Sequence, residues 1–186
     1  MGIDLYSVGN HQIKFAGRSY KEIAEEIKFK LDNLRIDYQS LLSLPYFRTG
    51  DEENSVSPES LSWNYSVNEF SGAIEFTGPY ELEISFNYYS IEFCSPCYRY
   101  YEWFEMEVNQ RDIWRKYFHQ ILKSFGGDRL MYFPDNAIFL DYFLDSSGSF
   151  EKKELRLQNR YGPAVNFSEE VDDYYRVYFI DRFYLV

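Results

Sequence analysis

The sequence from Ala73 to Tyr88, AIEFTGPYELEISFNY, contains two stretches of alternating polar and apolar residues around a Gly-Pro pair. The alternation is clearest from Glu81 to Tyr88, where Glu, Ser and Asn side chains stand between Leu, Ile, Phe and Tyr. Alternate residues of a strand lie on the same face, so this stretch predicts a strand with one apolar and one solvated face. Gly78-Pro79 predicts a turn, and Ala73–Thr77 is predicted to be the strand before it.

More strands are predicted on both sides of this hairpin. After Cys94-Ser95-Pro96-Cys97, the aromatic-rich run Tyr98–Val108 is predicted to be a strand. Three or four consecutive strands joined by short turns indicate an antiparallel meander. Outside the meander, strands are expected at Ile3–Val8, Arg129–Phe133 and Tyr174–Val186.

Amphipathic helices are predicted on either side of the meander. Ser19 and Glu22 have the spacing of a capping box, and the apolar residues behind them predict a helix over Tyr20–Leu34. A second helix is predicted over Gln110–Phe125, after Asn109 as the N-cap and before Gly126-Gly127. A third is predicted over Phe150–Arg160. The residues expected to be buried on the first two helices are Ile23, Ile27, Leu31, Trp114, Phe118, Ile121 and Leu122.

These elements predict an α+β fold. We expect a largely antiparallel sheet with two to three amphipathic helices packed on one face, in a single domain spanning residues 1–186. Hydrophobic residues make up 45% of the chain, which is enough for a core, and 19 Tyr and 17 Phe raise the aromatic content to 21%. Thr49–Ser60 is rich in turn formers and charge, which predicts a loop.

The net charge of −11 restricts the classes of partner. Nucleic acids and anionic membranes attract clusters of Lys and Arg, so neither is expected to bind here, whereas a basic protein would be attracted. No apolar stretch is long enough to cross a membrane, and the first residues lack the pattern of a secretory signal. With only two cysteines, a disulfide scaffold is not expected, and we expect a cytoplasmic protein.

Cys94-Ser95-Pro96-Cys97 allows three interpretations. A redox pair requires a helix N-terminus after the first cysteine, but the sequence predicts a strand there. A zinc site requires four ligands, which only His11 and His119 could complete, and these residues lack the usual spacing. We therefore predict a turn with two thiols, no bound metal and no cofactor, with the Cys2His2 site as the alternative.

Motifs for catalysis are not found in the sequence. It contains no Gly-x-Ser-x-Gly elbow, P-loop or Gly-x-Gly-x-x-Gly segment, and His11 and His119 are the candidates for a general base. No catalytic residue is predicted. The alternative is a small hydrolase-like enzyme whose site is built from dispersed carboxylates and tyrosines.

Three turn-rich segments in the last third of the chain carry a resemblance to known proteins. The segments are Gly126-Gly127-Asp128-Arg129, Tyr132-Phe133-Pro134-Asp135 and Tyr161-Gly162-Pro163-Ala164. They resemble segments of small acidic bacterial proteins that serve as immunity partners of secreted toxins. The resemblance implies a non-catalytic protein that neutralises a basic toxin, and it assigns no role to any single residue.

The predicted meander also carries the candidate binding surface. Its solvated positions place several acidic side chains on neighbouring strands, where they would attract a basic protein partner. The residues predicted to bind this partner are Glu75, Glu81, Glu83, Glu102 and Glu105. A homodimer that associates through an aromatic sheet face is the remaining alternative.

Overall fold

The computed structural model describes residues 3–47, 60–68, 70–135, 138–145, 147–167 and 176–183. Their α-helices are α1 (Tyr20–Asp32), α2 (Tyr38–Leu42), α3 (Tyr100–Glu105), α4 (Val108–Ser124), α5 (Ile138–Asp145) and α6 (Phe150–Tyr161). Their strands are β1 (Leu5–Gly9), β2 (Asn64–Asn68), β3 (Ala73–Thr77), β4 (Glu83–Phe86), β5 (Ile91–Phe93), β6 (Arg129–Pro134), β7 (Val165–Asn166) and β8 (Phe179–Arg182). Two short 3-10 helices are η1 (Pro45–Phe47) and η2 (Pro79–Glu81).

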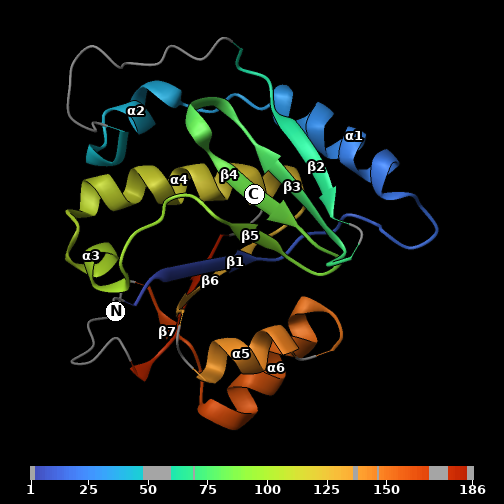
Figure 1. Ribbon diagram of the computed structural model, residues 1–186. Coiled ribbons are helices and arrows are strands. Elements are labelled where there is room, and N and C mark those ends of the chain that lie inside the picture. Colours follow the sequence, from blue (N-terminus) through green and yellow to red (C-terminus); the bar gives the residue numbers. More distant parts are fainter. Residues whose placement is uncertain are drawn as a thin grey trace.

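The eight strands form one sheet in the order β2-β3-β4-β5-β1-β6-β8-β7 (Figure 1). Neighbouring strands are antiparallel, except that β7 and β8 are parallel. Strands β2 to β5 follow one another in both the chain and the sheet, which confirms the predicted antiparallel meander. The α+β fold class with a largely antiparallel sheet is also confirmed.

The first face of the sheet is buried under α1 and α4. Apolar side chains of β3, β4 and β5 pair across the strands, as Ile74 does with Phe86 and Ile84 with Phe93. These side chains form one core with the apolar faces of the two helices. All seven predicted helix residues are at most 1% exposed, which confirms their assignment to the core: Ile23, Ile27, Leu31, Trp114, Phe118, Ile121 and Leu122.

A second, smaller core lies on the opposite face, under α5 and α6. Val8, Met131, Phe133 and Ile180 point to this side from β1, β6 and β8 and are buried. The predicted third helix is present as α6, and it packs here rather than beside α1 and α4. The sheet therefore has helices on both faces, with α5 and α6 as a separate pair (Figure 1).

The strand prediction for Tyr98–Val108 is wrong, because α3 and the start of α4 occupy this segment. Tyr100 and Trp103 are buried, and their spacing of three residues places them on one side of a helix. A Glu102 Oε2 atom accepts the backbone N–H of Arg99 at 3.0 Å, which stabilises the helix start. The aromatic content of the segment led to the wrong prediction, although its spacing was helical.

Other boundaries differ by smaller amounts. α4 begins at Val108, two residues before the predicted start, with Glu107 at the N-cap position in place of Asn109. α5 was not predicted, and Ile36–Phe47, to which the sequence assigns no element, contains α2 and η1. The described part of the last strand covers Phe179–Arg182. Most of the predicted loop over Thr49–Ser60 lies outside the described residues.

Replacing a buried ring on α4 should destabilise the fold. Phe118 is fully buried and contacts the rings of Phe93, Trp103 and Trp114. The Phe118→Ala variant should lose about 3–5 kcal/mol of unfolding free energy in urea, because the cavity cannot be filled. Phe29→Ala is the control, because Phe29 on α1 is 70% exposed. Equal losses for the two variants would contradict the assignment of the core.

Candidate functional site

The second face of the sheet is covered over only part of its width. Among the described residues, α5 and α6 pack on β1, β6 and β8, and no helix packs on this side of β2 to β5. These four strands surround a shallow hollow of about 420 Å³ on this face, lined by outward side chains and by residues whose side chains enter the first core. Its lining residues are Asn64, Tyr65, Ser66, Glu75, Phe76, Thr77, Glu83, Ile84, Ser85, Glu92 and Cys94.

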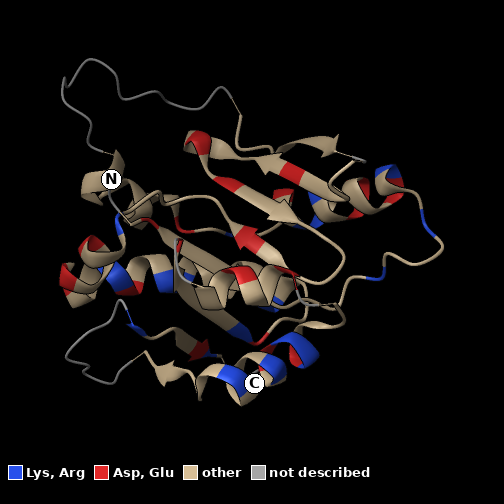
Figure 2. Ribbon diagram, turned by 60° about the horizontal axis from the view of Figure 1, so that its bottom comes forward, with Lys and Arg blue, Asp and Glu red and all other residues tan. Residues whose placement is uncertain are grey.

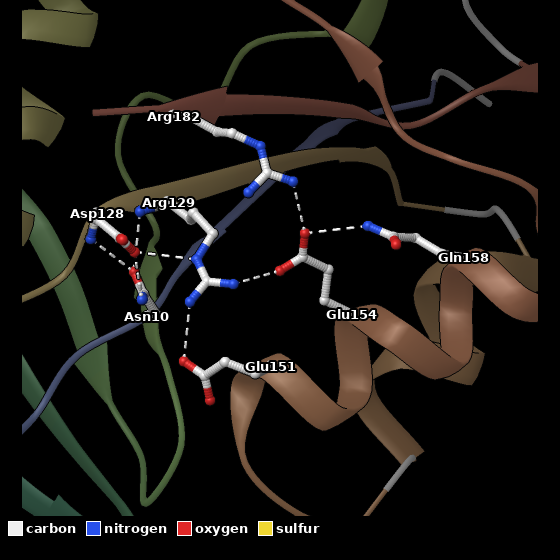
Figure 3. A network of polar contacts seen from close by, with 7 residues as sticks. All are labelled: Asn10, Asp128, Arg129, Glu151, Glu154, Gln158 and Arg182. Atoms are coloured by element: carbon white, nitrogen blue, oxygen red, sulfur yellow. Dashed lines mark hydrogen bonds and ion pairs between the residues drawn. The ribbon is translucent and has the colours of Figure 1, made fainter. Parts of the chain in front are cut away.

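A polar network holds α6 at the border of this hollow (Figure 3). Arg129, at the start of β6, donates to Glu154 at 2.7 Å and to Glu151 at 3.0 Å. Arg182 of β8 donates to the other oxygen of Glu154 at 3.0 Å, and Gln158 to the same oxygen at 3.1 Å. Glu154 is buried, so its charge requires these partners.

The same network extends to the turn before β6. Asp128 accepts from Arg129 at 3.0 Å and from the side-chain amide of Asn10 at 2.8 Å. The Asn10 side-chain oxygen accepts the backbone N–H groups of Asp128 and Arg129, both at 2.9 Å. A Cβ atom at Gly127 would collide with the carbonyl oxygen of Asn10. The predicted Gly126-Gly127 stop therefore also allows close contact between two segments.

Three carboxylates occupy neighbouring positions on the uncovered strands. In the strand register, Glu75 pairs with Ser85, and Ser85 pairs with Glu92 on its other side. Two strand spacings separate Glu75 from Glu92, which is about 10 Å between Cα atoms. Glu83 lies two residues before Ser85 on β4. It is therefore diagonal to both Glu75 and Glu92, at about 7–8 Å from each. We call Glu75, Glu83 and Glu92 the acidic face.

The acidic face has no ion pair with any described residue. Glu75 and Glu83 are exposed and Glu92 is half-buried. Glu75 contacts the hydroxyl of Ser66 at 3.5 Å, and Glu92 accepts the side-chain amide of Asn87 at 2.9 Å. Lys153 of α6 acts electrostatically on Glu92 without forming an ion pair, so Glu75 and Glu83 are the charges that these contacts leave uncompensated among the described residues. In Figure 2 the acidic positions of these strands are red, and the basic positions of α6 are blue.

The structure brings together only part of the predicted binding set. Glu75 and Glu83 share the acidic face, whereas Glu81 is exposed at the end of η2, outside the strand register and the lining of the hollow. Glu102 and Glu105 are exposed on α3, which packs on the first core through Trp103. They therefore do not lie on neighbouring strands of the meander, as the sequence had predicted.

Glu92 was missed by the sequence analysis. It stands between Ile91 and Phe93, which are both buried, so the alternation of one acidic and two apolar residues contained the signal. β5 has only three residues, which is a short stretch in which to recognise a strand. Tyr6 on β1 also borders Glu92, and burial together with this carboxylate raises the pKa of Tyr6 above its ordinary value.

The two cysteines lie beside the acidic face and are free thiols. Part of Cys94 reaches the surface, but burial of its sulfur raises its pKa to about 12, and Glu92 and Glu83 add to the effect. Burial, with Glu83 and Asp4, also raises the pKa of Cys97. A raised pKa disfavours the thiolate that redox catalysis requires, so the geometry favours the predicted turn with two thiols.

Both histidines are held in places that suit structural roles. The Nδ1 atom of His11 accepts the backbone N–H of Ile13 at 3.0 Å, and its Nε2 atom lies 2.9 Å from the carbonyl oxygen of Asn87. An N–H can only donate and a carbonyl can only accept, so His11 is neutral with its proton on Nε2. His119 stacks on Phe183 at 4.5 Å between ring centres.

The alternative zinc site does not form from these four residues. His11 uses both ring nitrogens for backbone contacts, and His119 lies on α4 against Phe183. No group of three or more His, Cys, Asp or Glu side chains is arranged for a metal in the described ranges. The expectation that the protein binds no metal stays a prediction.

Alkylation of Cys94 should be slow in the folded protein. In the Cys97→Ser variant at about pH 8, iodoacetamide should react with Cys94 at least about 100-fold more slowly than after unfolding in urea, because the thiolate is rare. The rate should rise steeply above about pH 10. Mass spectrometry measures the extent of labelling. Equal rates in the folded and unfolded states would contradict the raised pKa.

Protonation of His11 should destabilise the fold. Burial lowers its pKa below the ordinary value of 6.5, so the unfolded chain binds the proton first as the pH falls. The contribution of neutral His11 is complete above that value and decreases below it. Between about pH 7.5 and 5.5 the unfolding free energy of His11→Gln should therefore fall less than that of the unmodified protein. Burial and Lys123 also lower the pKa of His119, so the His119→Gln variant should flatten the slope too, and the two effects should add in the double variant. An unchanged slope in His11→Gln would refute the role of His11.

Comparison with known proteins gives no assignment. No protein-family model matches the chain, and neither the curated proteins nor the solved structures contain a significant match. None of the described helices has the length and apolar character needed to cross a membrane. The functional argument therefore depends on the geometry of the acidic face.

Proposed function

We propose that this chain is a non-catalytic protein-binding domain whose acidic face binds a basic polypeptide. The observation that carries the proposal is that Glu75, Glu83 and Glu92 share one surface and have no ion pair among the described residues. Cationic side chains of a partner would supply the missing counter-charges and speed its association.

The spread of the carboxylates favours a polypeptide over a small ligand. They lie on three strands, about 7–10 Å apart, so several separate cations fit them better than one. Tyr88 and Tyr89 are partly exposed at the turn between β4 and β5, next to this surface. Their rings add rigid contact area of the kind that anchors protein interfaces. Phosphate-rich partners would be repelled by the acidic face.

An immunity-type role is the form of this proposal that agrees with the acidic charge. A basic toxin is then the partner, and inhibition occurs by covering the toxin surface. Two free thiols are typical of a reducing compartment, so we place the protein in the cytoplasm. The hydrolase-like alternative requires carboxylates converging on a reacting bond, and the open sheet surface favours binding instead.

The proposal can be tested with a lysine peptide of about ten residues as the probe. The Glu75→Gln/Glu83→Gln variant should bind it about three- to tenfold more weakly at low salt, since each exposed charge pair contributes modestly. The matched control is Glu105→Gln/Glu107→Gln, which removes the same charge from exposed positions on and just after α3. Calorimetry measures the affinities, and added salt should reduce the difference between the two variants.

Two results would count against this function. Equal weakening by the two double variants would show that net charge alone attracts the peptide. Undiminished binding by Glu75→Gln/Glu83→Gln would show that the acidic face is not involved. When a natural partner is identified, reversal of the same two charges to lysine should mainly lower its association rate.

A further inference from the structure

β2 is the outermost strand on one side of the sheet, beside α1 (Figure 1). Its inner edge pairs with β3 over five residues, from Asn64 opposite Thr77 to Asn68 opposite Ala73. Within the described ranges, no other strand pairs with β2, and no backbone hydrogen bond outside the sheet engages it. Asn68 at its end accepts the Ser71 hydroxyl at its carbonyl oxygen at 3.3 Å. With respect to the described residues, the other outer N–H and C=O groups of β2 are available to an added strand.

β2 lacks the features by which edge strands usually avoid pairing. Its sequence, NYSVN, contains no charged residue and no proline. All five residues pair in regular register with β3, without a bulge. Lysines, prolines and bulges are the common means of blocking edge-to-edge pairing. An extended polypeptide can therefore align with this strand.

Apolar side chains are exposed around the same edge. Leu61 precedes β2 and Phe70 follows it, and both are exposed. Two residues of α1 contact this part of the chain: Glu25 accepts from the Tyr65 hydroxyl at 2.6 Å, and Asp32 accepts the backbone N–H of Trp63 at 2.7 Å. Phe29 lies between them on α1. The ring of Phe29 is 70% exposed. Exposed apolar side chains therefore stand before and after β2, and Phe29 supplies another on the side of α1 that contacts this part of the chain.

The acidic face lies within reach of a strand added to β2. Ser66 pairs with Glu75 of β3 on its inner side. A residue of the added strand that pairs with Ser66 on its outer side would lie on the same face as Ser66 and Glu75. Two strand spacings, about 10 Å, would then separate such a residue from Glu75. A lysine or arginine side chain covers most of that distance, and Ser66 is small enough to let it pass.

We infer that β2 receives an extended basic segment of the partner as a ninth strand of the sheet. Its lysine or arginine side chains lie toward the acidic face, and its alternate apolar side chains lie toward α1 and Phe29. The inference rests on the proposed function and adds the mode of binding. Main-chain hydrogen bonds supply affinity in strand addition, and alternating side chains supply specificity.

The test uses a synthetic peptide of about eight residues that alternates lysine and valine, a length typical of strands. The comparison peptide has the same side chains, but alternate backbone amides are methylated. The unmodified peptide should bind about tenfold more tightly, because methylation removes main-chain donors. Hydrogen exchange of the amides in residues 64–68 should slow when the unmodified peptide binds.

A protein variant provides an independent readout. Phe29→Ser should weaken binding of the alternating peptide but leave binding of the all-lysine peptide unchanged, because only the former has apolar side chains. Ile138→Ser is the matched control, since Ile138 is exposed to a similar degree on α5. It should leave both affinities unchanged.

The outcomes separate the binding mode from the binding function. If Glu75→Gln/Glu83→Gln weakens peptide binding but methylation has no effect and exchange at residues 64–68 is unchanged, the strand-addition mode is refuted and the acidic face remains the binding site. If neither peptide depends on Glu75 and Glu83, both proposals fail. If exchange at 64–68 already slows with protein concentration alone, β2 pairs with a second copy, and the inference is overturned.

Discussion

The structure depends on one constraint: a sheet has two faces, and apolar side chains on either face must be covered. α1 and α4 cover the first face across the meander. On the second face, β1, β6 and β8 carry large apolar side chains outward, and α5 and α6 cover those strands. Apart from Ala73, the outward residues of β2 to β5 are polar, so this part of the sheet is stable without a covering helix. The acidic face is therefore a consequence of strand polarity.

The position of α6 determines where the covered part of the second face ends. Arg129 and Arg182 from two strands meet Glu154 from α6, and few alternative positions of the helix would satisfy all three charges. Removing one member of such a buried set leaves an uncompensated charge, which is more costly than losing an exposed pair. The network thus limits the position of α6 more strictly than the contacts of Phe150 and Leu157 alone. In this way a structural ion cluster defines one border of the candidate binding surface.

Local patterns predicted much of the fold. The capping box at Ser19 and the alternation from Glu81 to Tyr88 each record a short-range rule. The helix formed from its predicted start, and the strand formed over the central part, Glu83–Phe86, with Glu81 in η2. Long-range effects were not predictable. Glu154 is 25 residues from Arg129, and nothing local shows that they meet. The candidate site was predictable only in part. Local alternation revealed Glu75 and Glu83, whereas β5 was too short to reveal Glu92. α3 was mispredicted because composition was weighted above spacing.

The charges of the folded protein fall into two groups. Carboxylates that fix elements to one another are paired, as Asp181 is with Arg115 at 2.6 Å and Glu154 is with Arg129. The acidic face forms no ion pair with a described Lys or Arg, and Lys153 of α6 acts on Glu92 electrostatically without pairing with it. Exposed carboxylates are well solvated, so leaving them unpaired costs little stability. Their mutual repulsion is nevertheless removed when cations from a partner bind.

The largest aromatic residues serve the core instead of the surface, since Trp63, Trp103 and Trp114 are fully buried. In the proposed binding mode, recognition at this surface depends on charge and on the backbone of β2 more than on exposed aromatic area.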